Sequence, residues 1–247
     1  MNKYDLVQNS NDSFLLKVPQ ITVLFWVTKI FATTFGETAG DAVSMSLNLG
    51  YLLSTFIFAT IFIALVFWQI KVKQYRPFVY WFTIIASTTV GTTLADFVDR
   101  SLGIGYIGGS SVLLSCICIS LWAWYKTEGS ISHHSANYPR AELFYWITIT
   151  FSQTLGTALG DWSADTAGLG YGGGIILFSA LILSILYLYL YTRISRTILF
   201  WAAFVLTRPL GAVVGDFLDK PISSGGLDLS RFDASIVLIV FIIICVL

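Results

Sequence analysis

Residues 146–161 read WITITFSQTLGTALGD, in which a Trp is followed by a Gly at position 10, by a second Gly at position 14 and by an Asp at position 15. The same frame recurs as WVTKIFATTFGETAGD (26–41), WFTIIASTTVGTTLAD (81–96) and WAAFVLTRPLGAVVGD (201–216). Four copies at fixed spacing indicate an internal repeat, and repeats have to be recognised before individual elements are assigned.

The four copies form two similar halves. The intervals between the Trp residues are 55, 65 and 55, so equivalent positions of the two halves lie 120 residues apart. We predict a tail at 1–17, a first half at 18–126, a polar linker at 127–139 and a second half at 140–247. A further glycine, 24 positions after each Trp, opens a second apolar segment in every copy: Gly50, Gly105, Gly170 and Gly225.

The composition is typical of an integral membrane protein. Of the 247 residues, 56% are hydrophobic and 11% are charged, against about 25% charged residues in soluble domains, and the mean hydropathy is +0.77. Apolar windows of about 20 residues are long enough to cross a bilayer. We predict an all-α integral membrane protein with eight transmembrane helices, two per repeat, as at 26–44 and 51–70. The last apolar run, 234–247, is short, so its helix either starts earlier, near Leu229, or continues beyond the given sequence.

Basic residues are concentrated in the tail and between the repeats, at Lys3, Lys17, Lys71, Lys73, Arg76, Lys126, Arg140, Arg193 and Arg196. Since cytoplasmic loops carry an excess of Lys and Arg, we expect a multi-pass protein of the cell (inner) membrane with both termini in the cytoplasm. The polar tail lacks the features of a signal peptide. Two helices per repeat make all four copies enter the bilayer in the same direction, as parallel repeats. A formal net charge of zero gives no indication of a nucleic-acid partner.

Positions 7, 11 and 15 after the Trp form one polar stripe on a helix. In turn the copies carry Thr33/Glu37/Asp41, Thr88/Thr92/Asp96, Gln153/Thr157/Asp161 and Arg208/Ala212/Asp216, and Lys29 extends the first stripe. Beside it runs a small-residue stripe: Gly36/Gly40, Gly91/Ala95, Gly156/Gly160 and Gly211/Gly215. Because small residues four apart let helices approach closely in lipid, we predict that these helices pack through their glycines and that the polar stripes converge on one axis.

The charges on that axis define the candidate site. One Glu and four Asp oppose one Lys and one Arg, which leaves a net charge of −3, and an unpaired charge at the bilayer centre costs about 2.5–3.5 kcal/mol on insertion scales. We therefore predict a bound cation or proton. Its expected ligands are Glu37, Asp41, Asp96, Asp161 and Asp216 with Thr92, Gln153 and Thr157, the four Asp being the metal ligands, while Lys29 and Arg208 balance the charge. Oxygen ligands suit Mn²⁺, Mg²⁺, Ca²⁺, Na⁺ or a proton, and no other cofactor is expected.

Depth along the helix follows from the frame. If the Trp residues are anchors in the inner aromatic belt, the Asp, 15 residues further on, lies about 22 Å along the axis at 1.5 Å per residue. The four Asp would then occupy the outer third of the bilayer. Pro209 precedes the glycine of the fourth copy, which predicts a kink and a departure from strict fourfold symmetry.

Two functions are compatible with these residues. The first is a small transporter or channel for a hard cation, in which a carboxylate titrates if transport is coupled to protons. The second is a non-transporting scaffold, sensor or partner subunit, in which the Asp residues are turn residues at the interface and Lys29 and Arg208 form structural ion pairs. An enzyme is not expected, because the sequence contains no HExxH motif and no evident pair of nucleophile and base. Either function is compatible with a homo-oligomer.

The repeated WxxxxxxxxxGxxx[GA]D frame, from Phe25 to Leu247, resembles a family of bacterial membrane-anchored proteins. That family is defined by a tandem repeat of unknown function with two transmembrane regions and a Trp in each. The resemblance implies four repeats and eight helices in a bacterial inner membrane. It implies no role for any individual residue.

Overall fold

The computed structural model describes residues 17–131 and 139–247. Nearly all of the predicted tail, 1–17, and the centre of the predicted linker, 127–139, therefore lie outside the described residues. The described residues form eight long α-helices: α2 (Val23–Asp41), α3 (Tyr51–Lys71), α4 (Pro77–Asp96), α5 (Tyr106–Glu128), α6 (Pro139–Asp161), α7 (Gly170–Tyr191), α8 (Arg196–Asp219) and α9 (Arg231–Val246). The last helix thus starts close to the position expected near Leu229.

Local sequence determines where several helices begin. The helices α4 and α6 start at Pro77 and Pro139, since proline has no N–H to lose in the first turn and its φ suits a helix. The glycine 24 positions after each Trp has a positive φ in all four repeats, from 64° to 86°. A Cβ at the first of these, Gly50, would meet nothing within 4 Å. The repeated glycine is therefore needed for its backbone conformation and not for close packing.

The first helix of a repeat continues past its Asp. In three repeats a single turn of π-helix follows directly, as η1 (Ala42–Ser46), η2 (Phe97–Ser101) and η4 (Trp162–Thr166). The fourth repeat differs, because α8 itself runs to Asp219 and a short 3₁₀ turn, η5 (Ile222–Ser224), follows. This extra turn carries the side chains three to five positions beyond the Asp, which become important at the candidate site.

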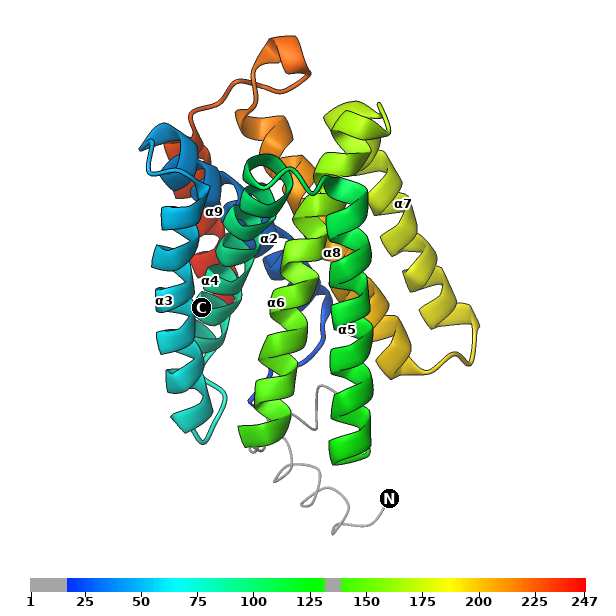
Figure 1. The fold of residues 1–247 in the computed structure, drawn as a ribbon. Helices are drawn as coiled ribbons and strands as arrows, with labels where there is room; N and C mark the ends of the chain where they lie inside the picture. The colour runs from blue at the N-terminus through cyan, green and yellow to red at the C-terminus, as the bar shows by residue number, and fades with distance from the viewer. Residues whose placement is uncertain (1–16, 132–138) are drawn as a thin grey trace, which may run out of the picture.

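The eight helices form two concentric rings (Figure 1). The inner helices, α2, α4, α6 and α8, each contact their two neighbours, and α8 closes the ring on α2. Each outer helix covers the inner helix of the next repeat: α3 packs on α4, α5 on α6, α7 on α8, and α9 on α2. Because the last repeat packs on the first, the tandem array closes into a circle instead of extending as an open solenoid.

Glycines determine how close the inner helices lie. Gly36 packs against Thr88 of the next repeat, so closely that an added Cβ would lie within 3.0 Å of it. The same relation recurs around the ring, between Gly91 and Gln153, Gly156 and Arg208, and Gly211 and Thr33, and one turn further on between Gly40 and Thr92, Gly160 and Ala212, and Gly215 and Glu37. The glycine stripe of one repeat thus receives the polar stripe of the next, which turns the polar side chains toward the common axis.

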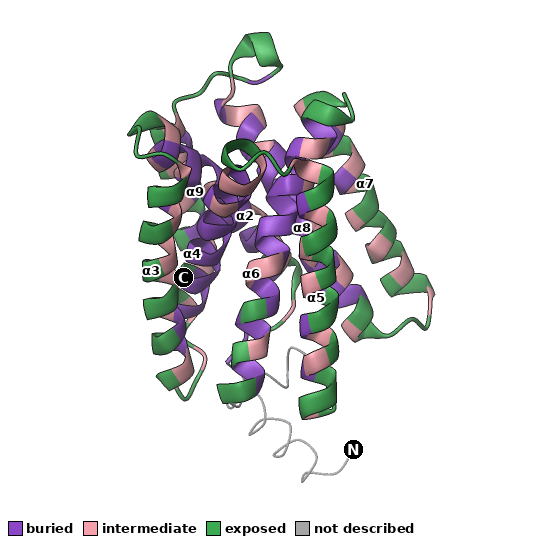
Figure 2. Cartoon of the chain, viewed as in Figure 1, coloured by how far each residue is buried: buried purple, intermediate pink, exposed green. Residues whose placement is uncertain are grey.

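Burial divides the two rings sharply (Figure 2). The inner helices are largely buried, whereas the outer helices present large apolar side chains to the exterior, such as Phe56, Ile107 and Ile176, which are 64–72% exposed. Within residues 17–131 and 139–247, five helices are long and apolar enough to cross a membrane: α3, α4, α5, α7 and α8. A wide apolar exterior around a polar interior is consistent with a membrane protein.

Three of the four frame Trp residues do not face the exterior as belt anchors would, contrary to the sequence-based interpretation. Trp81, Trp146 and Trp201 are buried, with 2–5% exposure, while Trp26 is half-buried. The ring centroids of Tyr80 and Trp146, and of Tyr145 and Trp201, lie 6.0 Å apart, and the Tyr80 and Tyr145 hydroxyls are hydrogen-bonded at 2.8 Å. Three of the frame Trp rings thus face neighbouring helices, and with the two Tyr rings they form an aromatic core near the N-terminal ends of the inner helices.

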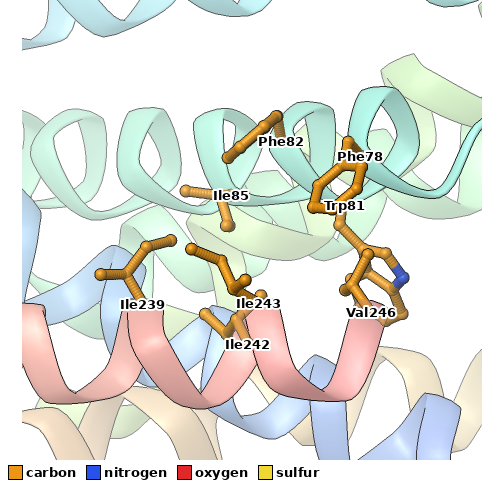
Figure 3. Close-up of a pocket in the computed structure, with 8 residues that line it drawn as sticks. All are labelled: Phe78, Trp81, Phe82, Ile85, Ile239, Ile242, Ile243 and Val246. Atoms are coloured by element: carbon orange, nitrogen blue, oxygen red, sulfur yellow. The ribbon is translucent and has the colours of Figure 1, made fainter.

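A small pocket of about 10 Å³ lies between α4 and α9 (Figure 3). Its lining is entirely apolar: Phe78, Trp81, Phe82, Ile85, Ile239, Ile242, Ile243 and Val246. A pocket of this size and composition offers no polar group to an ion, so the candidate site lies elsewhere, on the axis of the inner ring.

Candidate functional site

The Asp of each repeat lies at or near the C-terminal end of an inner helix, and all four are buried, with 1–4% exposure. We call Asp41, Asp96, Asp161 and Asp216 the aspartate ring. Carboxylate oxygens of Asp161, Asp216 and the equally buried Glu37 lie within 4.8 Å of one another. The same holds for Asp41, Asp216 and Asp219. The polar stripes therefore do meet, and two groups of three carboxylates result, each compact enough to surround one metal ion.

Arg100 closes one side of the aspartate ring. It lies one helical turn beyond Asp96, in η2, and its Nε contacts Asp96 Oδ1 at 2.8 Å. Its Nη2 contacts Asp161 Oδ2 of the next repeat at 3.2 Å. The side chain is 35% exposed whereas both carboxylates are buried. A cation at the mouth of the ring thus bridges the Asp residues of repeats two and three.

Lys220 occupies the equivalent position on the opposite side, 120 residues further on. Its Nζ lies 3.0 Å from Asp216 Oδ1 and 2.5 Å from Asp41 Oδ2, and so bridges repeats four and one. Burial by itself would lower the pKa of Lys220, but Asp216 and Asp41 outweigh it and hold the pKa well above its usual range. The ammonium is therefore fully charged near neutrality. We call Arg100 and Lys220 the caps.

The caps correct the predicted charge of the axis. The sequence-based sum of −3 counted only residues up to the Asp of each frame, and so left out Arg100 and Lys220, which follow an Asp by four residues. Both cations fold back by one turn onto the carboxylates, so that five acidic groups face four basic ones and the net charge falls to −1. A lysine or arginine four residues after an acid on one helix face is the signal that could have revealed them.

A surface hollow of about 460 Å³ adjoins the second carboxylate group. Asp219 and Arg231 line it, together with Asp228 and Ser46. Arg231 Nε contacts Asp219 Oδ2 at 2.8 Å and lies 3.9 Å from Asp41 Oδ2. The hollow therefore reaches from the surface of the protein to Asp219, which belongs to the same group of three carboxylates as Asp41 and Asp216. Neither Asp219 nor Arg231 belongs to the repeated frame, which is why the repeat pattern did not include them.

Arg208 dominates the axis below the aspartate ring. It is fully buried, and its Nη2 contacts Glu37 Oε2 at 2.9 Å. The same nitrogen lies 2.6 Å from the Thr92 hydroxyl and 2.5 Å from the Thr157 hydroxyl. The two threonines were predicted to assist an ion at the aspartate ring, and the structure places their oxygens on the guanidinium. One side chain thus joins the polar stripes of all four repeats.

Lys29 lies one helical turn nearer the N-terminal end of its helix than the level of Arg208, and it is also fully buried. Its Nζ donates to the Thr207 hydroxyl at 2.7 Å and to the Phe204 carbonyl at 3.1 Å, and it lies 3.8 Å from the centre of the Phe204 ring. Among the described residues it forms no ion pair with a carboxylate within 4.0 Å. It therefore balances the charge of the acids at a distance and not by contact.

Three other side chains lie 7 residues after a frame Trp, as Arg208 does, and are fully buried: Thr33, Thr88 and Gln153. The Thr33 hydroxyl donates to carbonyl groups of Ile30 and Thr207. The side-chain oxygen of Thr88 and both amide atoms of Gln153 have no hydrogen-bond partner among the described residues. We call Thr33, Thr88, Gln153 and Arg208 the central layer.

Fold and site define a class: an all-helical protein of four two-helix repeats, with an apolar exterior and a buried, charged axis. The chain belongs to the family described as Repeat of Unknown Function (DUF347), whose model matches residues 24–75, 79–130, 144–195 and 199–247. This match confirms the predicted membership of a tandem-repeat family of unknown function. No curated protein and no solved structure matches the chain.

Proposed function

We propose that this protein transports a small, hard cation across a membrane along the axis of its inner ring. The observation that carries the proposal is the convergence of buried carboxylates from different repeats, with oxygens of Glu37, Asp161 and Asp216 within 4.8 Å of one another. Carboxylate oxygens at this spacing suit Mn²⁺, Mg²⁺ or Ca²⁺, whose ligand distances are 2.0–2.6 Å. Burial of so many acids is expensive unless cations or protons compensate them.

The route to the site is supported by the hollow at the outer surface, which Asp219 and Arg231 line. From there a cation would pass to Asp41 and Asp216, which share a carboxylate group with Asp219. The caps act as internal competitors, since their nitrogens occupy the carboxylates that a cation would use. Further transport would require the aromatic core at the inner end to rearrange. Protonation of a carboxylate on cation release would couple transport to protons.

We further propose that all eight helices span the bilayer, with both termini in the cytoplasm. Beyond the five helices that are apolar enough by themselves, α2 and α6 carry their polar residues on the face that neighbouring helices cover. The helix α9, with 16 residues, packs on α2 beside the other outer helices. The excess of basic residues between the repeats favours the cytoplasmic side for those loops.

The proposal is tested by flux into proteoliposomes. Wild-type protein is expected to carry at least one of Mn²⁺, Mg²⁺, Ca²⁺, Na⁺ or protons faster than empty vesicles. Asp161→Asn should lower that flux about tenfold, the effect of about 1.4 kcal/mol, because it removes one of three converging carboxylates. Asp165→Asn is the matched control, since Asp165 lies one turn further along the same segment and is exposed. Equal flux in wild type and Asp161→Asn, or none in wild type, refutes the proposal.

The ion pairs favour a second candidate, a non-transporting scaffold or partner subunit. Arg100, Lys220 and Arg208 together contact every carboxylate of the aspartate ring and Glu37, which is the arrangement of a dry structural network. This candidate predicts no flux of any cation, and it predicts that Lys220→Met combined with Asp41→Asn leaves a partner-dependent function intact. The same flux measurement therefore distinguishes the two.

A further inference from the structure

Arg208 has more hydrogen-bond donors than the protein satisfies. A guanidinium carries five N–H groups, and the two on Nη2 face three oxygens, those of Glu37, Thr92 and Thr157. The remaining three, on Nε and Nη1, have no acceptor among the described residues, although the side chain is fully buried. An unmet donor in an interior is costly, and a charged group makes it more so.

Two further groups in the same layer lack partners. Both amide atoms of Gln153, on the neighbouring helix α6, are without a hydrogen bond among the described residues, and so is the hydroxyl oxygen of Thr88 on α4. Gln153, Thr88 and Arg208 occupy the same position of the repeated frame, on three consecutive helices of the ring. The Gln153 amide adds two N–H donors and Thr88 one O–H, so that donors outnumber acceptors.

The charge around this layer has the opposite sign to that of the aspartate ring. Positions 3, 7 and 11 of the four frames contain two cations, Lys29 and Arg208, and one carboxylate, Glu37. All three are buried, with 3% exposure or less. Arg208 pairs with Glu37, whereas Lys29 contacts neutral oxygens and an aromatic ring. The inner part of the axis therefore carries a net charge of +1.

We infer that the central layer binds a small monovalent anion of the size of chloride, held by the free donors of Arg208 and the amide of Gln153. A net positive charge together with unmet N–H groups is what an anion requires in an interior. The helices that carry these donors pack closely, since an added Cβ at Gly156 or Gly91 would lie within 3.0 Å of Arg208 or Gln153. For this reason the inference is confined to a ligand as small as a halide.

The anion site can be tested separately from cation transport, although a cation that moves along the axis would have to pass the central layer. The site lies about two helical turns from the aspartate ring, toward the N-terminal ends of the inner helices, and its occupancy can be measured without flux. If the flux assay fails, the anion site stands, and if the anion site fails, the aspartate ring remains as described.

Bromide is the probe. Crystals of the full chain grown in bromide are expected to show an anomalous peak between Arg208 Nη1 and Gln153 Nε2. In detergent, chloride should raise the thermal midpoint of the wild type relative to gluconate at equal ionic strength. Gln153→Leu should weaken the apparent halide affinity about tenfold. Thr33→Val is the matched control, because Thr33 lies in the same layer but its hydroxyl already bonds to carbonyl oxygens.

Three results overturn the inference. One is a central layer without a bromide peak. Another is a thermal midpoint in chloride that equals that in gluconate. The third is an equal halide response in Gln153→Leu and wild type. In crystals, this third result would be a bromide peak that persists in Gln153→Leu with unchanged occupancy, and it would show that the Gln153 amide is not part of the site. The crystallographic measurement needs no variant, so it decides the matter even if Gln153→Leu does not fold.

Discussion

The ion pair between Glu37 and Arg208 gives the sharpest test of the architecture. Both side chains are buried, with 3% exposure or less, and the Nη2–Oε2 distance is 2.9 Å. Removal of one partner of a buried pair costs about 3–5 kcal/mol, because it leaves an uncompensated charge, whereas replacement of both is often close to neutral. Substitution of Glu37 alone or of Arg208 alone should therefore lower the free energy of unfolding by more than the loss of their mutual contact would suggest. The effects of the two single substitutions should not add up to that of the double substitution.

The surroundings predict which substitution is worse. Glu37→Gln leaves Arg208 and Lys29 as two buried cations without a carboxylate in their layers, so we expect the upper end of the range, about 5 kcal/mol. Arg208→Met leaves Glu37 opposite the charge of Lys29, with the Thr92 hydroxyl still 3.2 Å from Oε2, so we expect about 3 kcal/mol. The double variant keeps Lys29 as the single charge and should cost less than Glu37→Gln does by itself.

The free energy of unfolding can be measured by SDS titration in mixed micelles, followed by the fluorescence of the eight Trp residues. The double-mutant cycle should give a coupling energy of about 3 kcal/mol, at the upper end of measured pairwise couplings. Asp165→Asn, at an exposed position, should change stability by less than about 0.5 kcal/mol. If Glu37→Gln costs less than 1 kcal/mol, or if the two single effects add, the two side chains are not a buried pair and the proposed order of the axis is wrong.

Two further predictions concern the ring and its caps. Gly91→Ala should destabilise the protein by about 1–3 kcal/mol through overpacking, because its Cβ would lie 2.8 Å from the Gln153 carbonyl carbon. Gly172→Ala is the control, since a Cβ there meets nothing within 4 Å. Equal stability of the two variants would contradict packing of the inner helices through their glycines. Since the pKa of Lys220 is raised by its carboxylates, its stabilisation is complete below its unfolded pKa of about 10.4 and is lost as pH rises through the folded pKa. The difference in unfolding free energy between wild type and Lys220→Met should therefore stay constant from about pH 7 to pH 10; a decline within that window would show that Lys220 is not held by Asp41 and Asp216.

The sequence predicts those features that recur in every repeat. The Trp–Gly–Asp frame has a helical period, so the four-repeat plan and the polar and small-residue stripes could be derived without coordinates. Features that occur once or twice could not. Position 19 of the frame is Met45, Arg100, Asp165 and Lys220 in the four copies, so no repeated pattern marks the caps. Their effect depends on a helix that continues for one more turn beyond the Asp, which a Gly-rich sequence does not suggest.

The Trp residues show a different limit. Hydropathy places a Trp near the end of an apolar segment, where belts of aromatic residues are common, but the direction of the side chain depends on which helices surround it. Here each inner helix has neighbours on every side, two in the ring and one outside. The frame Trp residues of repeats two to four are therefore enclosed. The helices were thus predicted correctly, but the exposure of these Trp side chains was not, since burial of an aromatic ring depends on tertiary contacts.

The symmetry of the ring explains why the site combines repeated and unrepeated residues. Closing four equivalent repeats into a circle necessarily brings four identical Asp carboxylates to one level, where they repel one another. Symmetric neutralisation of the four carboxylates would need one basic side chain from every repeat. No negative charge would then remain for a bound cation to neutralise. Two caps, one in each half and 120 residues apart, hold the Asp residues in two bridged pairs, Asp96 with Asp161 and Asp216 with Asp41. The caps therefore neutralise half of the charge of the aspartate ring. The residual negative charge at the C-terminal ends of the inner helices lies opposite a positive charge nearer their N-terminal ends. Such a separation of charge along one buried axis is what the proposed cation site and the inferred anion site would each require.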